Sequence, residues 1–159
     1  MKKILFIDRD GTLIKEPDDF QIDCLEKFQL VEHAICALLK LKSVGYQFVM
    51  ISNQDGLGTE SFPETDFWPS QHLLLQIMSS QGIIFSDILI DRSFEHEHKA
   101  TRKPNIGMLV NYLKDPEILW SSCAVIGDRD TDLQLAENLG CIGFKLESGV
   151  LSWPDIVAQ

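Results

Sequence analysis

Short apolar runs that end in polar turns alternate with amphipathic stretches along the chain. Five runs are continuous enough to predict buried strands, at residues 3–7, 47–52, 85–90, 122–126 and 142–146. Apolar residues at helical spacing predict helices at residues 32–43, 71–80, 106–113 and 133–139. Residues 56–70, which contain Pro63 and Pro69, are predicted to form a loop. Strands that alternate with helices indicate an α/β domain built on a parallel sheet.

Three polar clusters directly follow predicted strands. They are Asp8-Arg9-Asp10, Ser52-Asn53 and residues 128–132, a segment that begins and ends with Asp. Right-handed crossovers place the carboxyl ends of parallel strands at one edge of the sheet, where ligands of such sheets bind. The sequence therefore predicts that these clusters meet in space, although they are far apart in the chain.

The composition narrows the classes of function. The 159 residues include 14 basic and 24 acidic side chains, a formal net charge of −10, so the protein has no long-range attraction for nucleic acid or anionic membranes. No apolar run approaches the roughly 18 residues of a membrane span. The apolar start of the chain stops at Asp8, too soon for a secretory signal. The four cysteines form no Cys-x-x-Cys pair, which is typical of a reduced, cytoplasmic protein.

Asp8 and Asp10 are the first candidates for chemistry. Side chains two residues apart at a strand end project to the same side, and two carboxylates there repel each other unless a cation or a proton intervenes. Asp128 and Asp132 follow another strand. Carboxylates that converge on one edge favour a hard divalent cation, with Mg²⁺ the usual intracellular choice. A solvated turn at residues 8–11 and a helix-stabilising acid at Asp132 are the simpler alternatives.

Other side chains suit a phosphate group. Ser52 and Asn53 offer a hydroxyl and loop N–H groups, and Lys103 offers a compact cation just before a predicted helix. Beside an acidic metal site, these groups favour phosphoryl transfer. A Ser-Asn turn and a solvated basic segment are the structural alternatives.

The segment F-I-D-R-D-G-T-L (6–13) resembles the first motif, D-x-D-x-T/V, of the haloacid dehalogenase superfamily. Ser52 resembles the second motif, Lys103 the third and G-D-R-D-T-D (127–132) the fourth, in the same order along the chain. The resemblance implies a Rossmann-like three-layer sandwich with a mainly parallel central sheet. The chain length leaves room for only a minimal cap.

The same resemblance implies a phosphomonoesterase that works through an aspartyl-phosphate intermediate. Asp8 would be the nucleophile and Asp10 the general acid and base. Mg²⁺ would bind the Asp8 carboxylate, the Asp10 backbone carbonyl and Asp128. Ser52, Asn53 and Lys103 would contact the phosphate group.

A narrower set of segments, above all S-N-Q-D-G-L-G-T (52–59), is similar to the histidinol-phosphate phosphatase branch of this superfamily. This similarity implies hydrolysis of a small phosphate monoester, L-histidinol phosphate, in histidine biosynthesis. Glu16 would pair with the substrate ammonium and Gln21 would make a further polar contact, unless both are simply solvated loop residues. Members of this branch form half of a bifunctional enzyme, so fusion to or pairing with an imidazoleglycerol-phosphate dehydratase domain is expected.

The chain departs from that branch in the loop where the family carries a structural zinc ion. The ligand positions hold Asp91, Ser93, Lys99 and Thr101, none of which is a thiolate or an imidazole. We therefore expect no structural zinc. His96 and His98 lie in the same loop and are expected to be solvated.

Residues 1–150 are predicted to form the phosphatase domain, and residues 151–159 a C-terminal tail or the stub of a linker. Two other functions fit parts of the pattern. One is a different small-molecule phosphatase, such as one that acts on heptose bisphosphate. The other is a receiver-type phosphoacceptor domain, which also combines a parallel sheet with Mg²⁺, Asp, Ser/Thr and Lys.

Overall fold

A five-stranded sheet forms the centre of the computed structural model, which describes residues 1–159. All the strands are parallel and lie in the order β3-β2-β1-β4-β5. Their bounds are β1 (Lys3–Ile7), β2 (Tyr46–Asn53), β3 (Phe85–Asp91), β4 (Ala124–Gly127) and β5 (Ile142–Lys145). The sequence predicted each of these strands to within two residues at either end. The all-parallel arrangement confirms the predicted sheet.

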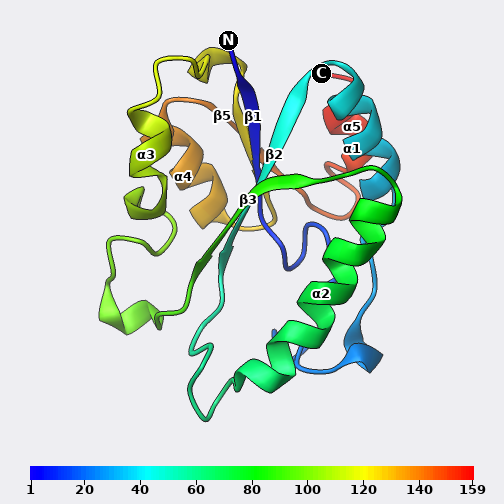
Figure 1. The fold of residues 1–159 in the computed structure, drawn as a ribbon, viewed down its shortest axis with the longest axis vertical. Helices are drawn as coiled ribbons and strands as arrows, with labels where there is room; N and C mark the ends of the chain where they lie inside the picture. Colours follow the sequence, from blue (N-terminus) through cyan, green and yellow to red (C-terminus); the bar gives the residue numbers. More distant parts are fainter.

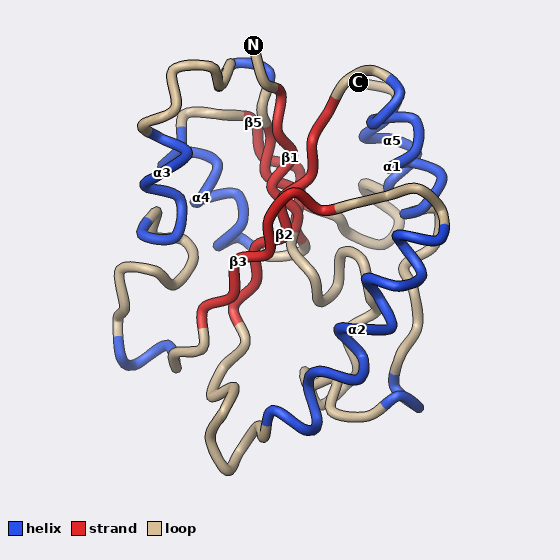
Figure 2. Tube along the Cα trace, in the orientation of Figure 1, coloured by secondary structure: helices blue, strands red, loops and turns tan.

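Helices cover both faces of this sheet. They are α1 (Ala34–Ser43), α2 (Glu64–Ser80), α3 (Val110–Leu113), α4 (Asp130–Leu139) and α5 (Trp153–Val157). Figure 1 shows α1, α2 and α5 on one side of the sheet and α3 and α4 on the other, and Figure 2 shows the strands between these two layers. The predicted three-layer sandwich is therefore confirmed.

Strand β1 shows how the sequence builds both cores. Its side chains alternate between the faces, as they must in a strand. Leu5 and Ile7 pack in the core beneath α1, whereas Ile4 and Phe6 pack in the core beneath α4. Because β1 pairs with β2 on one side and β4 on the other, all four side chains are almost completely buried. This central position carries the residue after Ile7, Asp8, to the middle of the carboxyl edge.

Helix α2 begins seven residues before the predicted start at residue 71, inside the stretch predicted to be a loop. Pro69 lies within the helix, where it lacks an N–H group for a helical hydrogen bond. The early turns are held by burial, because Phe67 is fully buried and packs edge-to-face on Phe62. The predicted helix at 106–113 is also different, since it consists of a 3-10 turn at Gly107–Leu109 followed by the single turn of α3.

The C-terminal residues belong to the packed structure. Trp153, in α5, is 1% exposed, and its Nε1 donates a hydrogen bond to the Thr12 carbonyl at 2.9 Å. The folded unit therefore extends beyond the boundary predicted at residue 150, into the segment 151–159 that was expected to be a tail or linker stub. A five-residue helix is too short to show a hydrophobic period, so the pattern gave no sign of it.

No large cap is inserted into the sandwich. Between β1 and α1 the chain forms only a 3-10 turn at Leu25–Lys27, and between β3 and the turn at Gly107–Leu109 it forms only a 3-10 turn at Glu95–Glu97. No inserted domain therefore covers the carboxyl edge of the sheet. None of the helices has both the length and the apolar character needed to cross a lipid bilayer.

Candidate active site

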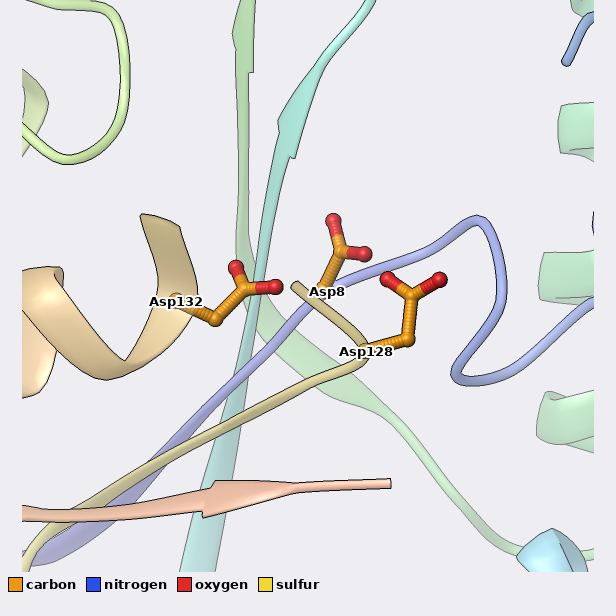
Figure 3. Close-up of side chains that lie close together, drawn as sticks. All are labelled: Asp8, Asp128 and Asp132. Carbon is orange, nitrogen blue, oxygen red and sulfur yellow. The ribbon is translucent and has the colours of Figure 1, made fainter. Parts of the chain in front are cut away.

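Three carboxylates meet at the carboxyl edge of the sheet. Asp8 directly follows β1, Asp128 follows β4, and Asp132 lies in the first turn of α4. One oxygen atom from each lies within 4.8 Å of the others. Figure 3 shows the three side chains together, with Asp8 between Asp132 and Asp128. The convergence of Asp8 and Asp128 that the sequence predicted is thus present in the fold.

The electrostatics of this cluster favour a cation. Burial raises the pKa of Asp8 well above its ordinary value, and the nearby Asp132 and Asp128 carboxylates add to the effect while Lys103 opposes it. Burial and the Asp132 charge also raise the pKa of Asp128. The raised pKa values of Asp8 and Asp128 indicate that nearby positive charges do not fully balance the negative charges of these carboxylates.

Two further features of the cluster fit a metal ion. Asp128 Oδ1 is buried and has no hydrogen-bond partner, although buried oxygen atoms are normally satisfied. Gly11, with a φ of +78°, lets the backbone approach so closely that a Cβ atom there would lie 2.0 Å from Asp128 Oδ2. A small, hard cation with oxygen ligands, such as Mg²⁺, fits this donor set.

Lys103 joins two of the three carboxylates. Its Nζ donates hydrogen bonds of 2.7 Å to Asp8 Oδ1 and of 2.7 Å to Asp132 Oδ1. Burial alone would lower the pKa of Lys103, but the two carboxylates raise it to about 12. The ammonium group is therefore charged, and Asp132 supports Lys103 rather than offering both of its oxygen atoms to a metal. Its second oxygen accepts a hydrogen bond from the Arg129 N–H at 3.1 Å.

The other two predicted phosphate-binding residues, Asn53 and Ser52, have different partners. Asn53 binds the backbone of Lys103 twice, accepting from its N–H at 3.0 Å and donating to its carbonyl at 3.2 Å. Ser52 is buried, and its Oγ accepts a hydrogen bond from Gln54 Nε2 at 2.8 Å. Asn53 thus holds Lys103 in place, and Ser52 lies beneath the cavity surface.

The Asp10 carboxylate does not face the other three acids. Its Oδ1 accepts a hydrogen bond from Arg9 NH1 at 2.6 Å, and its Oδ2 accepts one from Gln54 Nε2 at 2.6 Å. Arg9 is fully buried, and it donates to Gln71 at 2.8 Å and to Ser70 at 2.9 Å. Sequence reasoning missed the roles of Arg9 and Gln54, although both lie inside the motifs that it identified.

A cavity of about 740 Å³ opens above these groups. It is lined by Asp8, Asp10, Glu16, Gln21, Asn53 and Lys103, six of the eight predicted site residues. Glu16 forms an ion pair with Arg129, and Gln21 donates a hydrogen bond to the Ser61 carbonyl at 3.2 Å. Both residues are therefore at the cavity, but each is already engaged by the protein.

The loop after β3 offers no set of zinc ligands. The Asp91 carboxylate, at one of the positions expected for zinc ligands, is occupied by hydrogen bonds from Ser93 and Thr101. The side chains of this loop do not gather into a cluster of His, Cys, Asp or Glu with metal-binding spacing; the cluster at Asp8, Asp128 and Asp132 is the one that the structure contains. The residues present do not fit zinc, which requires about four nitrogen or thiolate ligands.

Solved structures share this architecture. A D,D-heptose 1.7-bisphosphate phosphatase from B. bronchiseptica, complexed with magnesium and phosphate, superposes with a TM-score of 0.78 and 22% identity over 90% of this chain and 79% of that one. A Had-superfamily hydrolase from Ehrlichia chaffeensis superposes with a TM-score of 0.64 and 19% identity over 99% and 96% of the two chains. The chain therefore shares the fold of these two proteins. The family model described as polynucleotide kinase 3 phosphatase matches residues 3–132, and the chain belongs to that family.

Curated relatives are much closer in sequence. The histidine biosynthesis bifunctional protein HisB of Xanthomonas euvesicatoria is 53% identical over 100% of this chain, and that of Xylella fastidiosa strain M23 is 56% identical over 93% of it. The chain covers 44% and 40% of these two relatives. It therefore spans less than half the length of the bifunctional proteins it matches.

Proposed function

We propose that the chain is a magnesium-dependent phosphomonoesterase that hydrolyses L-histidinol phosphate to L-histidinol and phosphate, in histidine biosynthesis. The observation that carries the proposal is the position of Asp8. Asp8 lines the cavity, beside a charged Lys103 and the unsatisfied Asp128. The similarity to bifunctional histidine-biosynthesis proteins supports the choice of substrate.

Asp8 is the nucleophile in this proposal. A carboxylate oxygen of Asp8 attacks phosphorus, the bond from phosphorus to the ester oxygen breaks, and an aspartyl phosphate forms. Mg²⁺, held by the Asp8 carboxylate, the Asp10 backbone carbonyl and Asp128, would neutralise the charge that otherwise repels a phosphate from Asp8. Lys103 supplies a second positive charge from the protein and orients the Asp8 carboxylate through its 2.7 Å hydrogen bond.

Asp10 moves the proton in both halves of the reaction. It protonates the departing alkoxide, and its carboxylate then takes a proton from the water that attacks the aspartyl phosphate, which releases phosphate and restores Asp8. Arg9 and Gln54 hold the Asp10 carboxylate at the edge of the cavity between turnovers. Proton donation requires Asp10 to exchange at least one of these hydrogen bonds for the substrate oxygen.

The cavity composition supports a small substrate with a positive charge. The acidic side chains of Glu16, Asp19 and Asp55 line the cavity together with Phe20 and Gln21. Each of these three acids is paired with a basic side chain of the protein, so one pair would have to open for a carboxylate to bind the ammonium of histidinol phosphate. Lys103 and a bound metal ion would bind its phosphate. The net charge of −10 opposes binding of a polynucleotide.

The remaining assignments follow from the same reasoning. We propose a cytoplasmic enzyme without structural zinc, since the loop after β3 lacks suitable ligands. We also propose a dehydratase domain as the partner, fused or paired, because the curated relatives are bifunctional proteins more than twice as long as this chain.

The decisive experiment measures phosphate release with and without Mg²⁺ on three substrates: histidinol phosphate, heptose bisphosphate and a 3′-phosphorylated oligonucleotide. We expect turnover of histidinol phosphate that requires Mg²⁺ and disappears in Asp8→Asn, with circular dichroism unchanged. A clear preference for either of the other substrates would overturn the substrate assignment. A single burst that leaves a long-lived phosphoprotein would instead identify a phosphoacceptor domain.

A further inference from the structure

We propose that Asp91 is a positioning residue: by closing the loop of residues 91–101 through hydrogen bonds, it sets Lys103 in the active site without a metal ion. The inference rests on the proposed function, because Lys103 acts there on Asp8. It adds a residue that lies outside the catalytic cluster, at a position where the related branch carries a zinc ligand.

The Asp91 carboxylate binds both ends of the loop. Its Oδ1 accepts hydrogen bonds from the Ser93 N–H at 2.9 Å and from Ser93 Oγ at 2.5 Å. Its Oδ2 accepts one from Thr101 Oγ1 at 2.5 Å. Asp91 is only 5% exposed, so these three donors satisfy a charge that would otherwise be buried without partners. We call this arrangement of Asp91, Ser93 and Thr101 the loop clasp.

The loop clasp is anchored in the sheet. Asp91 is the last residue of β3 and pairs in register with Asn53 of β2. Its carbonyl also accepts a hydrogen bond from the Gln54 N–H at 2.8 Å. A side chain fixed at this point holds Thr101, ten residues later, against the edge of the sheet. Closing a loop of this size costs conformational entropy, which the three hydrogen bonds offset.

The chain continues directly from the clasp to Lys103. Arg102 NH1 donates to the Ser93 carbonyl at 2.7 Å and to Asp55 Oδ1 at 2.6 Å. The next residue, Lys103, is held by the two backbone hydrogen bonds of Asn53. Thr101, Arg102 and Lys103 are thus each held by hydrogen bonds to other parts of the protein, and the partner of Thr101 is Asp91. Loss of the clasp would leave the approach to Lys103 held by Arg102 and Asn53 alone.

The test compares Thr101→Val, which has nearly the same shape but no hydroxyl, with Thr101→Ser, which keeps it. Thr101 is exposed, so neither change disturbs a core. Asp91→Asn is the second probe, and Asp87→Asn, an acid on the same strand outside the loop, is the matched control. Each variant is assayed for kcat on histidinol phosphate with saturating Mg²⁺, for melting temperature and for the rate of tryptic cleavage in the loop.

We expect Thr101→Val and Asp91→Asn to lower kcat about tenfold, the effect of about 1.4 kcal/mol in the barrier, with faster tryptic cleavage after Arg92 or Lys99. Thr101→Ser and Asp87→Asn should behave as the wild type. Rescue by Ser, and a fall in kcat of Thr101→Val without a matching fall in its melting temperature, distinguish positioning from general stability; Asp91→Asn is expected to lower the melting temperature as well.

The proposal is overturned if Thr101→Val keeps wild-type kcat and protease resistance, if Thr101→Ser is as impaired as Thr101→Val, or if the purified protein contains tightly bound zinc whose removal lowers kcat. Failure of the proposed function looks different. In that case the wild type would release no phosphate from histidinol phosphate, while the cleavage rates would still report whether the clasp holds the loop.

Discussion

Lys103 and Asp8 lie 95 positions apart in the chain, yet Lys103 Nζ donates a 2.7 Å hydrogen bond to Asp8 Oδ1. The bond is buried and is accompanied by an equal one to Asp132. The segments after β1, after β3 and between β4 and α4 meet at the carboxyl edge of the sheet and bring these groups together. The ammonium group therefore joins the end of β1, the first turn of α4 and the loop after β3 in one charged cluster.

The first prediction concerns this ammonium group. Lys103→Met keeps most of the apolar stem but removes the charge and both hydrogen bonds. We expect kcat to fall about 10²- to 10³-fold, as for loss of one preorganised donor in other active sites. Phosphate release at saturating substrate measures it, and Lys114→Met, on the surface, is the control. A kcat within threefold of the wild type would show that Lys103 has no role in the chemistry.

Metal binding gives the second prediction. Asp128→Asn removes one of the crowded carboxylate charges and a proposed metal ligand. Without metal, the variant should melt at a higher temperature than the wild type, because fewer like charges are buried together. Added Mg²⁺ should raise the melting temperature of the wild type by mass action and leave that of the variant unchanged. The exposed Asp130→Asn is the control; an equal response to Mg²⁺ in Asp128→Asn would exclude Asp128 as a ligand.

The third prediction tests the hydrogen bond from Gln54 to Asp10. Gln54→Leu has a similar volume but cannot donate to Asp10 or Ser52. If Gln54 positions the general acid, kcat should fall about tenfold for an alkyl phosphate and much less for p-nitrophenyl phosphate, whose leaving group needs no proton. Gln81→Leu, on the surface, is the control. An equal loss for both substrates would contradict this role.

Stability in acid provides the fourth prediction. Burial alone would raise the pKa of Asp91, but hydrogen bonds from Ser93 and Thr101 lower it below its ordinary value. A lowered pKa in the folded state means that the ionised group stabilises the fold above the unfolded-state value of about 3.9. This stabilisation is lost as the pH falls through the lower, folded-state value.

Urea unfolding of the wild type and Asp91→Asn measures this effect. We expect the wild type to be more stable by about 2 kcal/mol at pH 7, the size of a hydrogen-bonded charge. The difference should begin to shrink as the pH falls below about 3.9, because the unfolded wild type then takes up a proton at position 91. Once the pH has passed the lower, folded-state value, both proteins carry a neutral group there. A difference that stays constant down to pH 2.5 would show that the Asp91 charge does not matter.

The fifth prediction concerns Trp153. Trp153→Phe keeps an aromatic ring in the core but loses the hydrogen bond to the Thr12 carbonyl, and should cost about 1 kcal/mol. Trp153→Ala also leaves a cavity and should cost about 3–5 kcal/mol. Urea unfolding measures both. If Trp153→Ala were no less stable than the wild type, α5 would not be part of the folded core.

The sequence predicted which acids meet at the carboxyl edge of the sheet better than it predicted the contacts that hold them. Asp8 and Asp128 were found because each follows an apolar strand, and parallel strands share one edge. Arg9, which holds Asp10, is itself held by Ser70 and Gln71. These contacts were missed because Ser70 and Gln71 lie next to Pro69, at the predicted boundary of loop and helix. A proline at that place suggested a break, whereas burial of Phe67 keeps the helix intact.

Trp153 shows a second limit of the sequence. One tryptophan in a five-residue helix makes no period, and its partner, the Thr12 carbonyl, belongs to the backbone, which no residue pattern reveals. The boundary was therefore predicted at residue 150, because no pattern indicated a helix after that residue. Contacts between the two ends of a chain depend on the complete fold and not on local preference.

The hydrogen bond between Trp153 and Thr12 also sets an order of events during synthesis. A ribosome makes the segment that carries Asp8 and Asp10 long before the indole that braces this segment, which is 141 positions further on. Strand β4, which flanks β1, also comes more than a hundred residues later. The nascent chain therefore carries these acids on an unfinished support while most of the sandwich is made, and the acidic edge is complete only when nearly the whole sandwich has emerged.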